Sequence, residues 1–191
     1  MDPYYSFVFK GLLTEEALDK AGRNNKLINN ASLDAEIIKR LPFELLDIDL
    51  LIKAKRMATI YTAITAFENS IRDFVSSKLM EVFGDNWWEE AVSEKIRKLA
   101  ETRKKEEEKV KWHTQRGTSL INYIEFGDLI LIITKNWPHF EPHLQTLEWV
   151  NSILKPLERS RHVLMHSGEL DRQDIERIGT LMRDWIAQVG A

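Results

Sequence analysis

The sequence predicts an all-α fold, a helical bundle, from three observations. Apolar residues recur at intervals of three and four, the spacing of one face of a helix. Only 8 glycines and 5 prolines interrupt the 191 residues, and no strand-turn-strand pattern recurs. Hydrophobic residues make up 43% and charged residues 30%, as in an ordinary globular domain. We expect an N-terminal helical extension over residues 1–46 and a helical domain over residues 47–191.

Two short helices are predicted before the main one. The first covers Thr14–Gly22, with Thr14 as its N-cap and acidic residues in its first turn. The polar residues Asn24–Asn30 predict a break. A second helix over Ser32–Leu41 is expected to end before Pro42, because the residue preceding a proline is pushed out of the helical conformation.

The strongest helix is predicted over Asp47–Val82. Gly84 is expected to end it in a left-handed conformation. Asp85 or Asn86 is then expected to cap a helix that carries Trp87 and Trp88 and continues through Glu94 to Lys111. The periodic apolar positions of the strongest helix are Ile60, Ile64, Phe67, Ile71, Phe74 and Leu79.

Three further helices are predicted in the C-terminal half. The loop Arg116–Ser119 ends in a possible cap at Thr118 or Ser119. The helices are expected over Ile121–Trp137, over Pro142–His166 with a kink at Pro156, and from a cap at Asp171 or Asp174 to Val189.

Composition excludes several classes of function. The net charge of −3 provides no general field that attracts nucleic acid, so RNA binding requires a local basic patch or a pooled one in a homodimer. The absence of cysteine excludes disulfides and thiolate metal sites, and it favours a reducing, cytoplasmic location. We see no signal peptide and no span long enough for a membrane. The sequence contains no cofactor-binding motif. It also contains no metal-binding motif, since Pro142 interrupts the pair His139 and His143.

The strongest candidate site is Arg161-His162-Val163-Leu164-Met165-His166. An arginine is a permanent planar cation suited to phosphate, and a histidine can transfer a proton near neutral pH. At about 100° per residue, Arg161 lies within the apolar stripe of its helix, and His162 and His166 share a face about 100° to 140° away. Together these residue types could cleave RNA without a metal.

Structural roles for the same residues stay open at this stage. A buried guanidinium needs a partner, and Glu68, beside the apolar face of the strongest helix, is the candidate acid. His166 could instead cap the last carbonyls of its helix. The mixed charges of residues 94–111 are typical of a solvated helix face, although they could guide RNA. Trp87 and Trp88 could stack on bases, but core packing is favoured for at least one of them.

Five separated blocks resemble one family of helical domains. The chain resembles the HEPN family, named for nucleotide binding in higher eukaryotes and prokaryotes, over about residues 61–185. Its branch beside the PIN nuclease of an RNA-surveillance protein, which also occurs as bacterial stand-alone proteins, is the most similar. The blocks are Phe67-Glu68-x-x-Ile71-Arg72, Gly84-Asp85-Asn86-Trp87-Trp88, Tyr123–Leu129, Ile132-Ile133-x-x-Asn136-Trp137-x-x-Phe140 and Arg159-Ser160-Arg161-His162-x-x-x-His166-Ser167.

The resemblance implies a bundle with a long antiparallel helix pair, frequent homodimers and metal-independent RNA cleavage that leaves a cyclic phosphate. Carried over, Arg161 holds the scissile phosphate, His166 acts as general acid or base, and His162 assists. Glu68 and Arg72 match another block and support the site or form a structural ion pair. Gly168 stands where some HEPN toxins carry a modified tyrosine, so that form of control is not implied. Residues 1–46 match no part of the family.

Two functions follow from these observations. The first is a ribonuclease, a toxin or antiviral defence effector that cleaves single-stranded RNA or tRNA and is restrained by an antitoxin or regulatory protein. The second is a non-catalytic module that binds a protein partner, nucleotide or RNA. The presence of both Arg161 and His166 favours the first. The basic residues that could form an RNA-binding patch are Arg97, Arg103, Lys104, Lys105, Lys109, Lys111 and Arg116.

Overall fold

The computed structural model describes residues 7, 10–11, 13–14, 16–18 and 31–190. All regular elements within these residues are helical, and no strand occurs among them, which confirms the all-α prediction. The chain forms two compact units, residues 1–51 and residues 52–191. The expected boundary of an N-terminal extension at residue 46 stays a prediction.

The first unit contains α3, Ala31–Arg40, and the 3-10 turn η1, Phe43–Leu45. As expected, helix α3 ends just before Pro42. Of the helix predicted over Thr14–Gly22, Thr14 and residues 16–18 are described and are helical, while the other residues and the break at Asn24–Asn30 lie outside the described residues. Thr14 was wrongly predicted as a cap: its hydroxyl donates to the carbonyl of Lys10 (2.8 Å), and residues 10, 11 and 13 are already helical.

The long helix α4, Ile48–Phe83, closely follows its predicted bounds. Its apolar positions supply much of the core, and Gly84 ends the helix with φ +61°, as predicted. Neither Asp85 nor Asn86 provides a side-chain cap, since Gly84–Asn86 forms the 3-10 turn η2 that leads directly into α5, Trp87–Ala91.

The predicted continuous helix from Trp87 to Lys111 is wrong. Val92 and Ser93 are extended, with ψ 137° and 146°, so α5 ends and a separate α6 runs over Glu94–Glu108. The break allows both Trp87 and Trp88 to turn inward, where they are buried and pack edge to face with ring centroids 5.4 Å apart. Both are core residues, and neither is free to stack on RNA.

The predicted helix Ile121–Trp137 is also divided. Leu120–Tyr123 forms the 3-10 turn η3 without a side-chain cap from Ser119, Ile124 and Glu125 are extended, and α7 runs over Phe126–Lys135. The backbone N–H of Glu125 donates to the Asp128 carboxylate (2.8 Å), a reciprocal cap at the start of α7. The short helix α8, Trp137–Phe140, follows.

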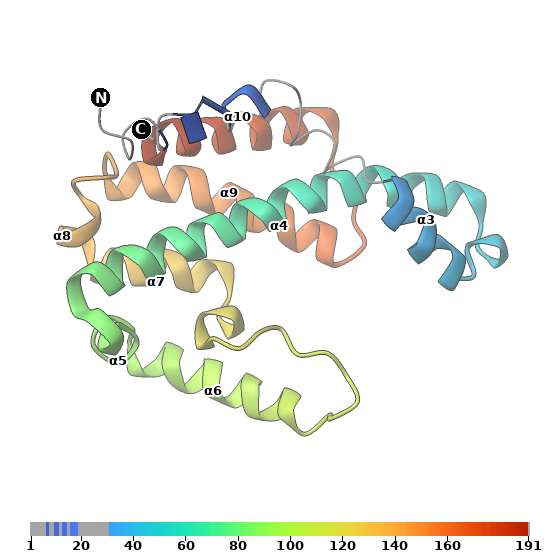
Figure 1. Ribbon diagram of the computed structural model, residues 1–191. Helices are drawn as coiled ribbons and strands as arrows, with labels where there is room; N and C mark the ends of the chain where they lie inside the picture. The colour runs from blue at the N-terminus through green and yellow to red at the C-terminus, as the bar shows by residue number, and fades with distance from the viewer. Residues whose placement is uncertain (1–6, 8–9, 12, 15, 19–30, 191) are drawn as a thin grey trace. The chain divides into compact units, whose positions relative to one another are not determined.

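The last two helices form an antiparallel pair (Figure 1). Helix α9 covers Leu147–Met165, beginning later than the predicted Pro142 because the Thr146 hydroxyl accepts the N–H of Trp149 (3.0 Å). It passes through Pro156 and also packs against α7. Helix α10 covers Arg172–Val189, and Asp171 caps it by accepting the N–H of Asp174 (2.8 Å), as predicted.

An aromatic cluster joins α4 to this pair. The buried Trp185 of α10 stacks on Trp149 of α9, with centroids 5.6 Å apart and planes at 7°. The same ring meets Phe67 and Phe74 of α4 edge to face, at 6.2 Å and 6.1 Å. Such pairs contribute about 0.5–1.5 kcal/mol beyond the apolar area that they bury. They fix α4 against α9, and this packing positions the candidate site.

Candidate active site around Arg161

Arg161 of α9 lies against Glu68 of α4. Its Nε atom is 2.7 Å from Glu68 Oε2, and its Nη1 atom is 3.9 Å from Glu125 Oε2. The side chain is 22% exposed, whereas that of Glu68 is 7% exposed. The structure thus provides the acidic partner that the position of Arg161 in an apolar stripe requires.

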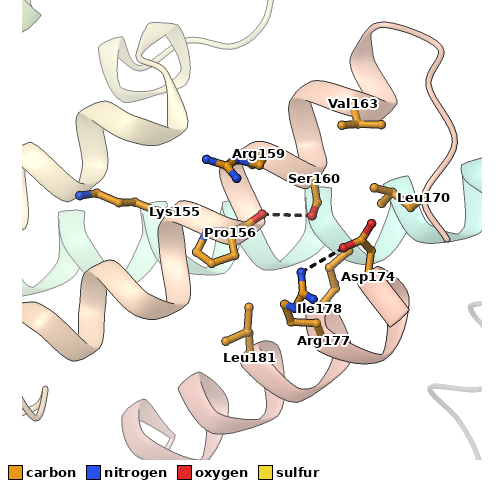
Figure 2. A pocket seen from close by; sticks show the side chains of 10 residues that line it. All are labelled: Lys155, Pro156, Arg159, Ser160, Val163, Leu170, Asp174, Arg177, Ile178 and Leu181. Atoms are coloured by element: carbon orange, nitrogen blue, oxygen red, sulfur yellow. Dashed lines mark hydrogen bonds and ion pairs between the residues drawn. The ribbon is translucent and has the colours of Figure 1, made fainter. Parts of the chain in front are cut away.

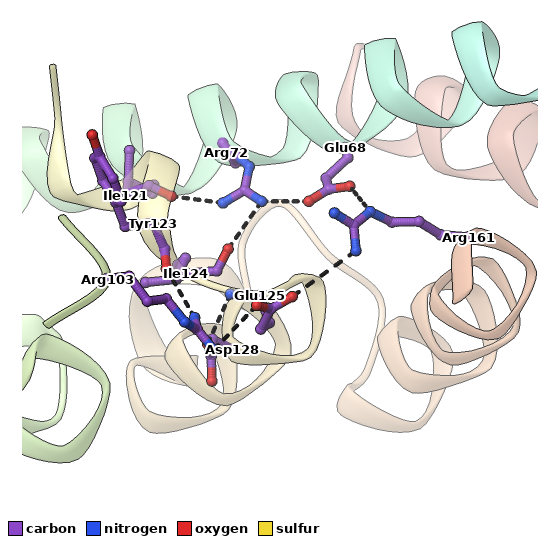
Figure 3. A network of polar contacts seen from close by, with 9 residues as sticks. All are labelled: Glu68, Arg72, Arg103, Ile121, Tyr123, Ile124, Glu125, Asp128 and Arg161. Carbon is purple, nitrogen blue, oxygen red and sulfur yellow. Dashed lines mark hydrogen bonds and ion pairs between the residues drawn. The ribbon is translucent and has the colours of Figure 1, made fainter. Parts of the chain in front are cut away.

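Glu68 also pairs with Arg72, one helical turn further along α4 (Figure 3). Its two carboxylate oxygens therefore contact different guanidinium groups, Arg72 through Oε1 and Arg161 through Oε2. Glu68 and Arg72 are 5% and 8% exposed, so this is a buried network rather than a surface pair. The predicted association of Glu68 and Arg72 with Arg161 is present, and Arg72 acts through Glu68.

Two arginines hold η3 and the residues that follow it. Arg72 donates from Nη1 to the carbonyl of Ile121 (2.6 Å) and from Nη2 to that of Ile124 (3.2 Å). Arg103 of α6 donates to the carbonyl of Tyr123 (2.9 Å) and pairs with Glu125 Oε1 (3.1 Å). Because these bonds fix the backbone just before α7, they place the Glu125 carboxylate between Arg103 and Arg161 (Figure 3).

The network alternates in charge, with Arg72, Glu68, Arg161, Glu125 and Arg103 in series. Each carboxylate is shared by two guanidinium groups, so the five groups together carry one positive charge. Within the described part of the chain, the Arg161 guanidinium has ion-pair partners only in Glu68 and Glu125, and its side chain is 22% exposed. An oriented, partly exposed guanidinium is suited to bind an oxyanion such as phosphate.

His162 and His166 lie on the exposed side of the end of α9. Among the described residues, neither imidazole makes a hydrogen bond, an ion pair or a ring contact, and in particular neither is bonded to Arg161. The helix end is satisfied by backbone: the N–H of Gly168 donates to the carbonyl of Val163 (2.8 Å), and that of Ser167 to Leu164 (3.1 Å). The His166 side chain is therefore not needed as a cap.

The turn after His166 is built from an unusual pair of residues. Ser167 occupies the left-handed position with φ +61°, where glycine is the usual residue. Gly168 is the next residue. A Cβ atom at this position would lie 2.6 Å from Val163 Cγ1 and 2.9 Å from the Val163 carbonyl oxygen. Glycine is thus required at residue 168 by close approach rather than by its φ angle.

Sequence reasoning did not assign a role to Glu125 or recognise how Arg103 supports the site. The spacing Glu125-x-x-Asp128 before an apolar run was the available signal, since it resembles a capping box. Arg103 carried no local signal, because its partners lie on a different element.

The histidine pair that Pro142 interrupts packs against aromatic rings of α4. His139 and His143 pack edge to face on Phe83 (5.3 Å) and Phe74 (6.3 Å). In the described residues, no three His, Cys, Asp or Glu side chains gather as a possible metal site. None of the helices described here is long and apolar enough to cross a membrane.

A model of the Swt1-like HEPN family matches residues 62–190, a range that contains Glu68, Arg72, Glu125 and the whole Arg161–His166 segment. The chain belongs to the HEPN family. Membership supports a role related to nucleotides or RNA, while the likeness to the branch found beside a PIN nuclease stays a prediction. No curated protein and no solved structure matches the chain significantly.

Proposed function

We propose that this HEPN protein is a metal-independent endoribonuclease that cleaves single-stranded RNA or tRNA. The observation that carries the proposal is the partly exposed guanidinium of Arg161, oriented by Glu68, in the same C-terminal turns of α9 as two exposed and unpartnered imidazoles. A fixed cation and a free proton carrier are the groups that RNA cleavage through the 2′-hydroxyl requires.

In the proposed reaction, the 2′-oxygen bonds to the adjacent phosphorus while the bond from phosphorus to the 5′-oxygen breaks. The 2′-hydroxyl loses a proton and the leaving oxygen gains one, so the products are a 2′,3′-cyclic phosphate and a 5′-hydroxyl. Arg161 binds the phosphate and stabilises its added charge. His166 acts as general acid or base, with His162 assisting. Glu68, supported by Arg72, is a positioning residue for Arg161.

The biological setting of this proposal is a toxin or antiviral defence effector in the cytoplasm, restrained by an antitoxin or regulatory protein. A homodimer would place two sets of Arg161, His162 and His166 at one RNA. One chain could then supply the general base and the other the general acid. The expectation that residues 1–46 form a separate extension makes them a candidate partner-binding segment.

The test is cleavage of mixed single-stranded RNA and tRNA by purified protein in a metal chelator. His162→Ala and His166→Ala are informative variants, because these imidazoles make no bond with the described chain and their loss should leave folding intact. His113→Ala, another exposed histidine, is the matched control. We expect cleavage by the parent and the control, products ending in cyclic phosphate, and at least a hundredfold loss in His166→Ala.

Arg161→Ala should also abolish cleavage, with circular dichroism as the check on folding, since this change removes a partner of Glu68. Equal cleavage by the parent, Arg161→Ala and His166→Ala would refute the proposed site. Folded parent protein that cuts neither RNA in the chelator would refute the metal-independent ribonuclease and favour a non-catalytic binding module.

A further inference from the structure

The side of α9 turned away from Arg161 carries a second set of cations. Lys155, Arg159, His162 and His166 follow one another in steps of four, three and four residues, so they form one stripe along the helix. All four are exposed. At a rise of about 1.5 Å per residue, the stripe covers about 16 Å of α9, and it ends at the candidate catalytic histidines.

Lys155 and Arg159 lie outside the basic patch that was predicted from the sequence. Within the described residues, neither forms a hydrogen bond or an ion pair. By contrast, Arg103 is bound to Tyr123 and Glu125, Lys104 donates to the carbonyl of Thr118 (3.2 Å), and Arg116 pairs with Glu107 (2.6 Å). Three of the seven residues of the predicted basic patch are thus bound internally, whereas both of these cations of α9 are available to an external anion.

A groove between α9 and α10 lies beside this stripe (Figure 2). It encloses about 290 Å³, near the lower end for small-molecule pockets. Lys155 and Arg159 lie on its α9 side, and apolar side chains from both helices and from the segment between them form much of its wall. The residues of that apolar wall are Pro156, Val163, Leu170, Ile178 and Leu181.

The charges in the groove favour an anionic ligand. Its one carboxylate, Asp174, is paired with Arg177 (3.1 Å), which leaves Lys155 and Arg159 without a compensating acid there. The Ser160 hydroxyl is turned back to the carbonyl of Pro156 (3.0 Å), so it does not compete for these cations. A ligand with an apolar planar part and a phosphate matches this combination better than a peptide or an inorganic ion, which would leave the apolar wall or the cations unused.

We infer that this groove binds one nucleotide of a single-stranded RNA, with Lys155 and Arg159 on its phosphate and the apolar wall against its base. The inference rests on the proposed function, because the stripe leads along α9 from the groove to His162 and His166. It assigns the α9–α10 groove as a substrate-binding subsite on the opposite side of α9 from the Arg161 network.

The experiment measures binding of a short single-stranded 2′-O-methyl RNA, which lacks the attacking hydroxyl and stays intact. Fluorescence anisotropy is recorded over a range of salt concentrations for the parent and for the double variant Lys155→Gln with Arg159→Gln. The matched control is Lys98→Gln with Arg172→Gln, which changes the net charge equally at side chains that are 72% and 88% exposed.

Each phosphate contact on single strands contributes about 0.7 to the slope of log K against log salt. Because both cations bind one phosphate, loss of this contact should lower the magnitude of that slope by about 0.7 and weaken binding about tenfold near physiological salt. The control should bind within about twofold of the parent. Ser160→Leu, which fills the groove without changing charge, should weaken binding several-fold at an unchanged slope.

An unchanged affinity in the Lys155/Arg159 variant, or an equal loss in the control, would overturn the subsite. The subsite would also be refuted if Ser160→Leu bound RNA as tightly as the parent, or if the parent bound a double-stranded RNA of the same length more tightly. These outcomes are independent of catalysis. If the parent protein binds RNA through Lys155 and Arg159 but does not cleave it, only the proposed ribonuclease activity is refuted. If it cleaves RNA and neither binding nor cleavage depends on these residues, only the subsite is refuted.

Discussion

Replacing Glu68 by glutamine tests whether the buried network holds the bundle together. The carboxylate accepts a hydrogen bond from Arg72 and forms an ion pair with Arg161 Nε (2.7 Å). The amide oxygen of glutamine can accept from one of these guanidinium groups. Its NH₂ group is itself a donor, so it cannot bind the N–H groups of the other guanidinium. One charge-assisted interaction of Glu68, worth about 1.5–3 kcal/mol, is lost. The substitution also removes the negative charge that lies between Arg72 and Arg161.

The burial of each arginine sets the size of the effect. Removing one partner of a fully buried ion pair costs about 3–5 kcal/mol. Arg72 is 8% exposed but keeps its bonds to two backbone carbonyls, and Arg161 is 22% exposed and can draw on water and on Glu125. We therefore expect Glu68→Gln to lower the free energy of unfolding by about 2–4 kcal/mol. The melting temperature should fall by about 2–4 °C for each kcal/mol.

The assay is urea unfolding followed by far-UV circular dichroism, with linear extrapolation to zero urea. Glu94→Gln is the matched control, since Glu94 pairs with Lys98 one turn away but is 69% exposed. Its loss should change stability by less than about 0.5 kcal/mol. If Glu68→Gln is as stable as Glu94→Gln, the network does not support the fold, and the assignment of Glu68 as the group that orients Arg161 fails with it.

Three further changes test the helix ends and the core. Ser167→Gly should raise the melting temperature, with a gain of about 1 kcal/mol, because glycine adopts φ +61° without strain; an unchanged or lower value would contradict this account of the turn. Asp171→Ala should cost about 1 kcal/mol in urea unfolding, since the N–H of Asp174 loses its acceptor, and an unchanged midpoint would exclude the cap. Leu154→Ala, at a fully buried position, should cost about 2–5 kcal/mol by calorimetry, while Leu131→Ala, at a residue 58% exposed, should cost much less; similar losses would argue against the described core.

Local rules explain which features could be predicted from the sequence. The spacing of apolar residues in α4 requires only helical periodicity, and the end of that helix at Gly84 requires only the conformational freedom of glycine. The cap at Asp171 is likewise set by neighbouring residues. Even the need of Arg161 for an acid followed from its position in an apolar stripe, because an unpaired buried guanidinium is too costly.

Tertiary packing decided the features that local rules could not. Residues 121–137 are apolar enough for one helix, yet Arg72 and Arg103 bind the carbonyls of Ile121, Tyr123 and Ile124 and hold that backbone in a turn. The role of Glu125 follows from that turn. The groove beside Lys155 and Arg159 likewise exists only because α10 packs against α9. Residues that meet from different helices leave no periodic signal in the sequence. The sequence alone therefore determined the helices and the need for an acid near Arg161. The tertiary structure decided which groups meet there.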